Sequence, residues 1–191
     1  MPSIKGTKTE KNLLAAFAGE SQARNRYEMY AKKAKKEGYV QISEIFQDTA
    51  DNEYQHAKRF FSFLEGGEAE IVASYPAGKV GTTLENLKES AGGEHHEHAE
   101  LYPMFAQIAK EEGFPEVSKQ FKAIAMAEVS HEERFLKLID IIEKDIVFKR
   151  GDKVYWRCSK CGYIHEGTVA PQECPSCKHP TEYFFIHSEN F

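Results

Sequence analysis

A Glu-x-x-His motif occurs twice in this sequence of 191 residues, and each copy interrupts an apolar stripe with helical spacing. The first copy pairs Glu53 with His56, and the second pairs Glu128 with His131. Residues three positions apart on a helix lie one turn apart on the same face. Each motif therefore directs a carboxylate and an imidazole toward the surface that the apolar stripe packs against. The pattern predicts helices that carry metal ligands into the interior of a bundle.

Two further helical stretches carry acidic residues on their apolar faces. Glu20 lies in the first stripe and Glu94 in the third, with Glu97 three residues later on nearly the same face. A buried carboxylate without a partner costs several kcal/mol, so these glutamates require a cation between them. With Glu53 and Glu128 they supply five negative charges, against about +4 to +6 for two ferrous or ferric ions. Oxygen-rich ligation with imidazole favours iron or manganese over copper or a structural zinc, and the sequence predicts a carboxylate-bridged two-metal site.

Other polar residues near these glutamates give weaker evidence of a role at the metal site. Tyr27 and Tyr102 occupy matching positions, as core tyrosines or as donors that orient the carboxylates. Helical geometry turns His95 and His96 away from the seam. We expect these two and His98 to be solvated or to support the ligands, and we leave all three out of the predicted ligand set.

The helical region is an internal duplication, and capping residues and glycines mark the expected ends of its helices. Capping boxes predict helix starts at Thr7 and Thr82, and glycines at 38 and 113 suit helix ends. A fourth helix is expected from Pro115. The two helical hairpins repeat at an offset of 75 residues, but Glu20 and Glu94 are 74 apart, which predicts a single-residue bulge in one helix. Residues 66–81 are the expected crossover between the hairpins.

All four cysteines lie in a short C-terminal segment that is rich in aromatic residues and turns. They form two C-x-x-C knuckles, and four thiolates at this spacing bind one ion in a tetrahedron. Zinc and iron are both satisfactory there, and the spacing alone favours a structural zinc ribbon. We expect a bundle at residues 1–147, a linker at 148–152 and a small metal domain at 153–191. The four predicted ligands are Cys158, Cys161, Cys174 and Cys177.

Composition excludes several classes of function. The formal net charge is −5, so the chain has no basic field for nucleic acid or an anionic membrane. The N-terminal apolar run, Leu13 to Ala18, is too short for a membrane span or a secretory signal. With cysteines in metal-type pairs, the expected setting is the reducing cytoplasm.

On these residues the chain resembles the rubrerythrin family over essentially its full length. Glu20, Glu53-Tyr54-Gln55-His56, Glu94-His95-His96-Glu97 and Glu128-Val129-Ser130-His131 carry the resemblance, followed by the two cysteine knuckles. It implies a mainly α fold, a ferritin-like four-helix bundle joined to a small C-terminal rubredoxin-like domain. It also implies a non-haem di-iron centre in the bundle and a single iron in the four-cysteine site. The gap between the knuckles is shorter than in free-standing rubredoxins, as expected for this family.

The resemblance also implies a mechanism. Glu53 and Glu128 would bridge the irons, Glu20 would bind one, and Glu94 and His131 the other, with Glu97 or His56 completing the first according to oxidation state. The diferrous pair would reduce hydrogen peroxide to water, and the tail iron of a head-to-tail homodimer partner, or of a higher homo-oligomer, would return the electrons. The sequence contains no G-x-G-x-x-G or P-loop, so NADH would be oxidised by an external electron-donor protein. A ferroxidase or iron-storage protein, a manganese catalase and a zinc-ribbon scaffold are the alternatives.

Overall fold

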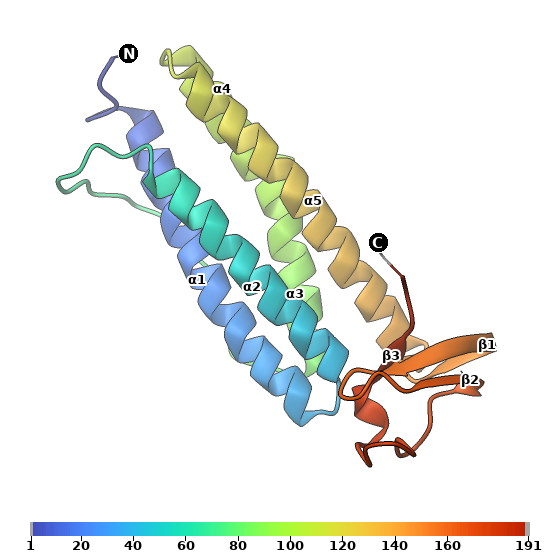
Figure 1. Cartoon of the computed structure of the whole chain (residues 1–191). Helices are drawn as coiled ribbons and strands as arrows, with labels where there is room; N and C mark the ends of the chain where they lie inside the picture. The colour runs from blue at the N-terminus through green and yellow to red at the C-terminus, as the bar shows by residue number, and fades with distance from the viewer. Residues whose placement is uncertain (1, 190–191) are drawn as a thin grey trace.

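The fold is an antiparallel four-helix bundle with a small β domain at one end (Figure 1). The structure is a computed structural model and describes residues 2–189. One hairpin comes from the first half of the helical region and the other from the second half, where a helix with a π turn in its middle pairs with the last helix. The helical elements are α1 (Lys8–Lys36), α2 (Val40–Phe61), α3 (Thr83–His96), the π turn η1 (Glu97–Leu101), α4 (Tyr102–Glu111) and α5 (Pro115–Glu143).

The predicted helix boundaries are confirmed. The Thr7 hydroxyl accepts a hydrogen bond from the Glu10 backbone N–H, and Thr82 forms a complete capping box with Glu85. Gly38 and Gly113 follow the ends of α1 and α4 with φ of +84° and +86°, a region that residues with a Cβ rarely adopt. Local backbone chemistry therefore sets where each hairpin turns.

The π turn is the bulge that the repeat offset predicts. Glu20 and Tyr27 are seven residues apart in α1, whereas their counterparts Glu94 and Tyr102 are eight apart. The extra residue is absorbed at Glu97–Leu101, because a π turn adds one residue without changing the helix direction. Beyond it the two hairpins return to the common offset of 75.

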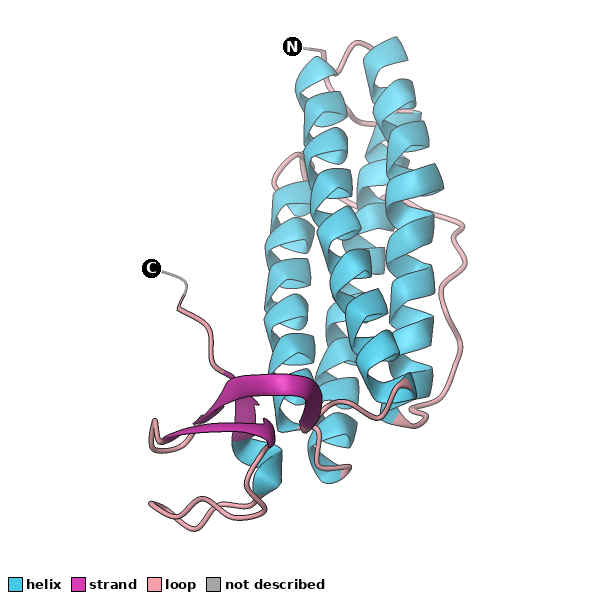
Figure 2. Cartoon of the chain, turned by 90° about the vertical axis from the view of Figure 1, so that its right-hand side faces the viewer, coloured by secondary structure: helices cyan, strands magenta, loops and turns pink. Residues whose placement is uncertain are grey.

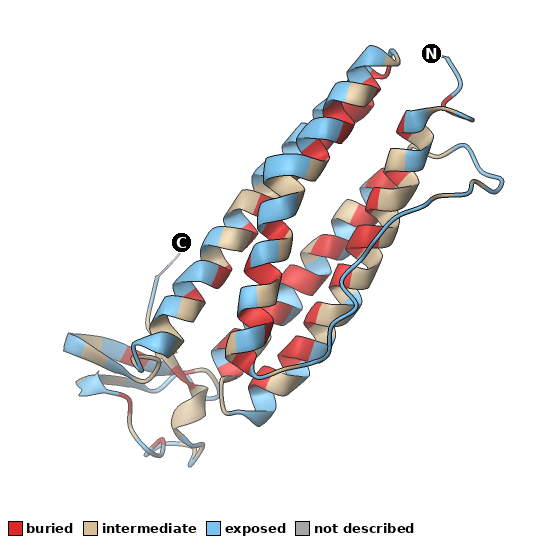
Figure 3. Cartoon of the chain, turned by 180° about the vertical axis from the view of Figure 1, so that it is seen from behind, coloured by how far each residue is buried: buried red, intermediate tan, exposed pale blue. Residues whose placement is uncertain are grey.

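The crossover between the hairpins is an extended segment without helix or strand. Residues 62–82 leave the end of α2 and run along the outside of the bundle to the start of α3 (Figure 2). Most of the segment is exposed (Figure 3). It is fastened to the first helix by Tyr75, whose hydroxyl donates to the Ala15 carbonyl oxygen at 2.7 Å.

Two apolar clusters fill the bundle and leave a layer between them for the acidic residues. Phe60 and Phe121, with ring centroids 4.9 Å apart, belong to one cluster. Phe46 and Phe135, 5.4 Å apart, belong to the other. These two pairs are related by the 75-residue repeat, so each cluster is the duplicate of the other. The glutamates and histidines of the seam lie between them.

The C-terminal domain is a three-stranded antiparallel sheet in the order β2-β1-β3. Its core contains the buried Trp156, whose indole N–H donates to the Gly167 carbonyl oxygen at 3.0 Å. It stands at the end of the bundle where α1 turns into α2, and Glu37 and Glu182 line a common cleft there. The elements are β1 (Lys149–Cys158), β2 (Ile164–Val169), a 3-10 turn η2 (Thr181–Tyr183) and β3 (Phe184–Ile186).

Strand β1 begins at Lys149, within the segment expected to be a linker, because Lys149 pairs with Val169 across the sheet. The domain limits at 147 and 153 stay predictions. Within residues 2–189, no helix has the length and apolar character that a membrane span needs.

Candidate metal centres

The layer between the apolar clusters contains one inward carboxylate from each helix of the bundle. Glu20 comes from α1, Glu53 from α2, Glu94 from α3 and Glu128 from α5, and all four are fully buried. His131 is also buried, and the His56 side chain is 14% exposed. The structure thus brings six of the seven predicted bundle ligands together.

These side chains form two overlapping groups of possible metal ligands. Glu20 and His56 belong to one group, Glu94 and His131 to the other, and Glu53 and Glu128 to both. The Nδ1 atom of His56 lies 3.0 Å from Glu53 Oε2 and 2.9 Å from Glu128 Oε1. The Nδ1 atom of His131 lies 2.8 Å from Glu128 Oε2 and 3.3 Å from Glu53 Oε1. Two neighbouring ion positions with shared carboxylates fit this arrangement.

Unpartnered polar atoms show that this layer is built for cations. Among the side chains of residues 2–189, several buried ligand atoms lack a hydrogen-bond partner of acceptable geometry. Native proteins leave few such atoms, because each costs about 1–3 kcal/mol or more when charged. They are Glu20 Oε2, Glu53 Oε1, Glu94 Oε2, both oxygens of Glu128 and Nδ1 of His131. The donor set, oxygen with imidazole, suits non-haem iron.

The pKa values of the carboxyl groups in this layer are strongly shifted from their usual values. Burial, followed by repulsion from Glu53, raises the pKa of Glu94 to about 8, and burial raises the pKa of Glu20 well above its usual range. For Glu53, burial is outweighed by the close contacts of the His131 and His56 imidazoles, which lower its pKa to about 2. Protonation therefore provides positive charge in this layer, which bound metal ions would otherwise supply.

The two imidazoles show the complementary shift. Burial by itself lowers their pKa, but the close contacts with the Glu128 and Glu53 carboxylates outweigh it. The pKa of His56 rises to about 9 and that of His131 to about 12. A bound cation would have to displace these protons, since a metal-bound imidazole nitrogen carries none.

Two buried tyrosines connect the halves of the duplication. The Tyr27 hydroxyl in α1 donates to Glu94 Oε1 at 2.5 Å, and the Tyr102 hydroxyl in α4 donates to Glu20 Oε1. Each tyrosine therefore orients the carboxylate that the opposite hairpin contributes. This arrangement supports the role as donors over the role as simple core residues.

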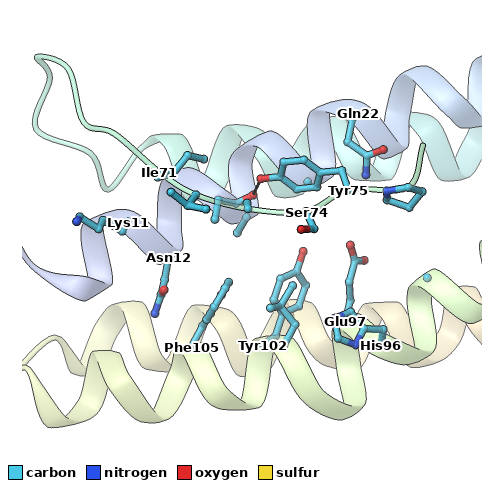
Figure 4. Close-up of a pocket in the computed structure, with 18 of the residues that line it drawn as sticks. Lys11, Asn12, Gln22, Ile71, Ser74, Tyr75, His96, Glu97, Tyr102 and Phe105 are labelled. Atoms are coloured by element: carbon cyan, nitrogen blue, oxygen red, sulfur yellow. Dashed lines mark hydrogen bonds between the residues drawn. The ribbon is translucent and has the colours of Figure 1, made fainter. Parts of the chain in front are cut away.

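Glu97 lies apart from the two groups of ligands. It lines a cavity of about 650 Å³ between α1, the π turn and α4, under the crossover segment. In Figure 4 its carboxylate points across this cavity toward Ser74 and Tyr75, with the Tyr102 ring beside it. Burial and the charges of Glu94 and Glu128 raise the pKa of Glu97 well above its usual range. The cavity therefore borders the carboxylate layer at Glu97 and at Tyr102, whose hydroxyl donates to Glu20.

The three neighbouring histidines have partners that the sequence does not reveal. His95 Nδ1 lies 3.1 Å from Glu132 Oε1, and His98 Nε2 lies 2.5 Å from Glu132 Oε2. His96 instead contacts Glu100 on the surface, at 3.3 Å. Glu132 was missed because its only sequence signal is its position directly after His131.

The four cysteines come together at the tips of two knuckles. Cys158 Sγ lies 3.7 Å from Cys177 Sγ, and Cys161 Sγ lies 3.6 Å from Cys174 Sγ. Sulfurs at tetrahedral corners, about 2.3 Å from a metal, are about 3.8 Å apart, so the spacing fits one ion. A hydrogen bond from the Tyr163 backbone N–H lowers the pKa of Cys161 to about 6, which favours the thiolate.

The bundle and its ligand layer place the chain in the class of ferritin-like di-iron proteins, here joined to a rubredoxin-like domain. The rubrerythrin family matches residues 11–139, and the rubredoxin-like domain of rubrerythrin matches residues 156–185. The chain belongs to the rubrerythrin family. Its cofactors are a non-haem di-iron centre in the bundle and one iron in the four-cysteine site, and it is an iron-binding oxidoreductase.

Individual relatives cover the whole chain. Rubrerythrin of Nitratidesulfovibrio vulgaris is 57% identical over 191 residues, with 100% of both chains covered. A putative rubrerythrin of Methanocaldococcus jannaschii is 47% identical, with 96% of this chain and 94% of that one covered. A solved structure of nigerythrin in its fully reduced, all-ferrous state has a TM-score of 0.64 at 32% identity and covers 96% of this chain and 91% of its own.

Proposed function

We propose that this protein is an NADH-linked peroxidase that reduces hydrogen peroxide to water and protects against oxidative stress. The observation that carries the proposal is the pair of adjacent ion positions that share Glu53 and Glu128, in the same chain as a four-thiolate iron site. When bound, the ferrous pair supplies two electrons together, so that hydrogen peroxide and two protons give two water molecules without release of hydroxyl radical.

The two groups support a division of ligand roles. We propose that Glu53 and Glu128 would hold both ions, that Glu20 would hold the first, and that Glu94 with His131 would hold the second. His56 stands in the first group, whereas Glu97 points into the cavity. We propose that Glu97 or His56 completes the first position according to oxidation state.

The cavity under the crossover supports a small neutral substrate. Its lining includes the aromatic rings of Tyr75 and Phe105 together with the Glu97 carboxylate. Burial and the neighbouring carboxylates raise the pKa of Glu97, which favours the protonated carboxyl. We propose that it hydrogen-bonds entering peroxide and supplies a proton to the departing oxygen.

We propose that electrons enter from another chain. The tail domain stands at the end of the bundle where α2 begins, and Glu53 is 13 residues from Val40, about 20 Å along the helix axis. This separation supports a head-to-tail homodimer or a higher homo-oligomer, in which the tail of one chain serves the centre of another. The His56 side chain is 14% exposed, more than that of any other of the six grouped ligands. We therefore propose that electrons reach the centre through His56. An external NADH-dependent donor protein would then reduce the tail.

The test starts from anaerobic, fully reduced protein, to which hydrogen peroxide is added while the visible absorption of the four-thiolate iron is followed. We expect rapid colouring as this iron is oxidised. Slow colouring would instead indicate a ferroxidase, a protein that stays colourless would indicate zinc in the tail, and oxygen evolution would indicate a catalase. Cys174→Ser should abolish donor-driven turnover, and unchanged turnover in this variant would contradict the electron-donor role of the tail.

A further inference from the structure

A second cluster of metal-type ligands lies on the outside of the bundle, between the π turn and α5. His95, His98 and Glu132 each offer one ligand atom, and these atoms lie within 4.8 Å of one another. The two imidazoles contact different oxygens of the same carboxylate, at 3.1 Å for His95 and 2.5 Å for His98. Their rings are nearly perpendicular, with centroids 5.2 Å apart, so both nitrogens face the carboxylate from different sides.

We propose that His95, His98 and Glu132 bind one divalent transition-metal ion, separate from the di-iron centre and the four-cysteine site. Two imidazoles with one carboxylate form the ligand set of many mononuclear zinc and ferrous sites. Ligand atoms about 2.0–2.1 Å from a tetrahedral ion are about 3.3 Å apart. The His95 contact already matches this spacing, and the His98 contact reaches it with a shift of less than about 1 Å.

The surroundings of the cluster suit an exchangeable ion. Glu132 and His98 are partly enclosed, with side chains 18% and 16% exposed, whereas the His95 side chain is 59% exposed. Two ligands are therefore fixed by packing, and the third side is open for water to complete the coordination. Glu132 contacts both histidines, one with each of its carboxylate oxygens.

The π turn creates this cluster. His95 is the last residue but one of α3, and His98 lies in the π turn Glu97–Leu101. The extra residue of the turn changes the angle between these positions relative to a regular helix, and it brings both imidazoles toward Glu132 on α5. Glu94 and Glu97 alternate with these histidines along the chain. This part of the helix therefore carries glutamates on one face and the two histidines on another.

The test is a calorimetric titration of the iron-loaded protein, with both iron centres oxidised, using Zn²⁺ in air and Fe²⁺ without oxygen in separate experiments. We expect one further equivalent per chain with at least one of these ions, and an unchanged visible spectrum that shows both iron centres intact. Co²⁺ offers a second readout, because coordination by nitrogen and oxygen in an open site gives visible absorption bands.

Variants separate a metal site from a pair of hydrogen bonds. Removing one of three ligands in His95→Ala or Glu132→Gln should weaken binding at least tenfold. His96→Ala is the matched control, because His96 lies on the same helix and contacts only Glu100 among the acidic residues of the described chain. His95→Ala removes an exposed side chain and leaves folding intact. Absence of a further equivalent, or equal binding by His95→Ala and His96→Ala, would overturn the proposal.

Discussion

The crossed hydrogen bonds from Tyr27 and Tyr102 predict that each hairpin controls the metal affinity of the other. Tyr102→Phe removes the donor to Glu20 without changing the ring that packs in the core. Burial raises the pKa of Glu20 and this hydrogen bond lowers it, so its loss makes the carboxylate harder to ionise. The first ion position, which contains Glu20, should bind more weakly.

The magnitude follows from the chemistry of the contact. A buried hydrogen bond to a charged group is worth about 1.5–3 kcal/mol, and about 1.36 kcal/mol corresponds to a factor of ten. We therefore expect Tyr102→Phe to weaken binding of the first ion roughly tenfold to 150-fold. Tyr27→Phe should weaken the second position, which contains Glu94, by a similar factor.

A double-mutant cycle gives the assay. Apoprotein variants are titrated anaerobically with Co²⁺ against a competing chelator, for Tyr102→Phe, Glu20→Gln and the double variant. The coupling free energy between Tyr102 and Glu20 should be about 1.5–3 kcal/mol, while Tyr102 with Glu94 serves as the control cycle and should show less than about 0.5 kcal/mol. Equal coupling in both cycles, or none in either, would refute the crossed arrangement.

Three further predictions follow from the site and the core. Loading the apoprotein with two Fe²⁺ ions should release about two more protons at pH 7 than near pH 10, because the pKa values of about 8 for Glu94 and about 9 for His56 lie between these two pH values. Metal affinity therefore rises with pH, and a pH-stat that records constant release would contradict this assignment. Glu97→Ala should keep two bound irons, because its carboxylate lies outside both ligand groups and His56 remains to complete the first position. It should slow peroxide reduction about a hundredfold in stopped-flow measurements, and loss of one iron would show that His56 cannot replace Glu97 at the ion site. Phe121→Ala should lower the free energy of unfolding of the apoprotein by about 3–5 kcal/mol in urea titrations, since this fully buried ring contacts Phe60 and Phe105, and a loss below about 1 kcal/mol would show that the cluster closes over the gap.

Features set by local sequence were predictable in this chain. The helix starts at Thr7 and Thr82 depend on a hydroxyl three residues before a free backbone N–H, and this spacing is visible in the sequence. The inward direction of Glu53 and Glu128 follows from helical period alone. The π turn was also predictable, because repeat counting detects one inserted residue whatever the packing around it.

Features set by packing between distant segments were not predictable. The contact of His98 with Glu132 depends on which faces α3 and α5 present to each other, and no single-helix pattern specifies that angle. Strand β1 starts early because of a partner 20 residues later, Val169. The cavity at Glu97 exists only because an extended crossover without a helical period lies over α1.

The π turn also makes the two ion positions unequal. Duplication alone gives matched sets, Glu20 with His56 and Glu94 with His131, each oriented by a tyrosine from the other hairpin. The residue of α1 that corresponds to Glu97 at the offset of Glu20 and Glu94 is Ala23, so only the second hairpin supplies a fifth carboxylate. Because the bulge absorbs the inserted residue, the aromatic clusters on either side keep their symmetric packing and the asymmetry stays local. The cavity therefore lies beside Glu97, which has no counterpart in the first hairpin, and in the proposed peroxidase this arrangement would give the reaction a defined side.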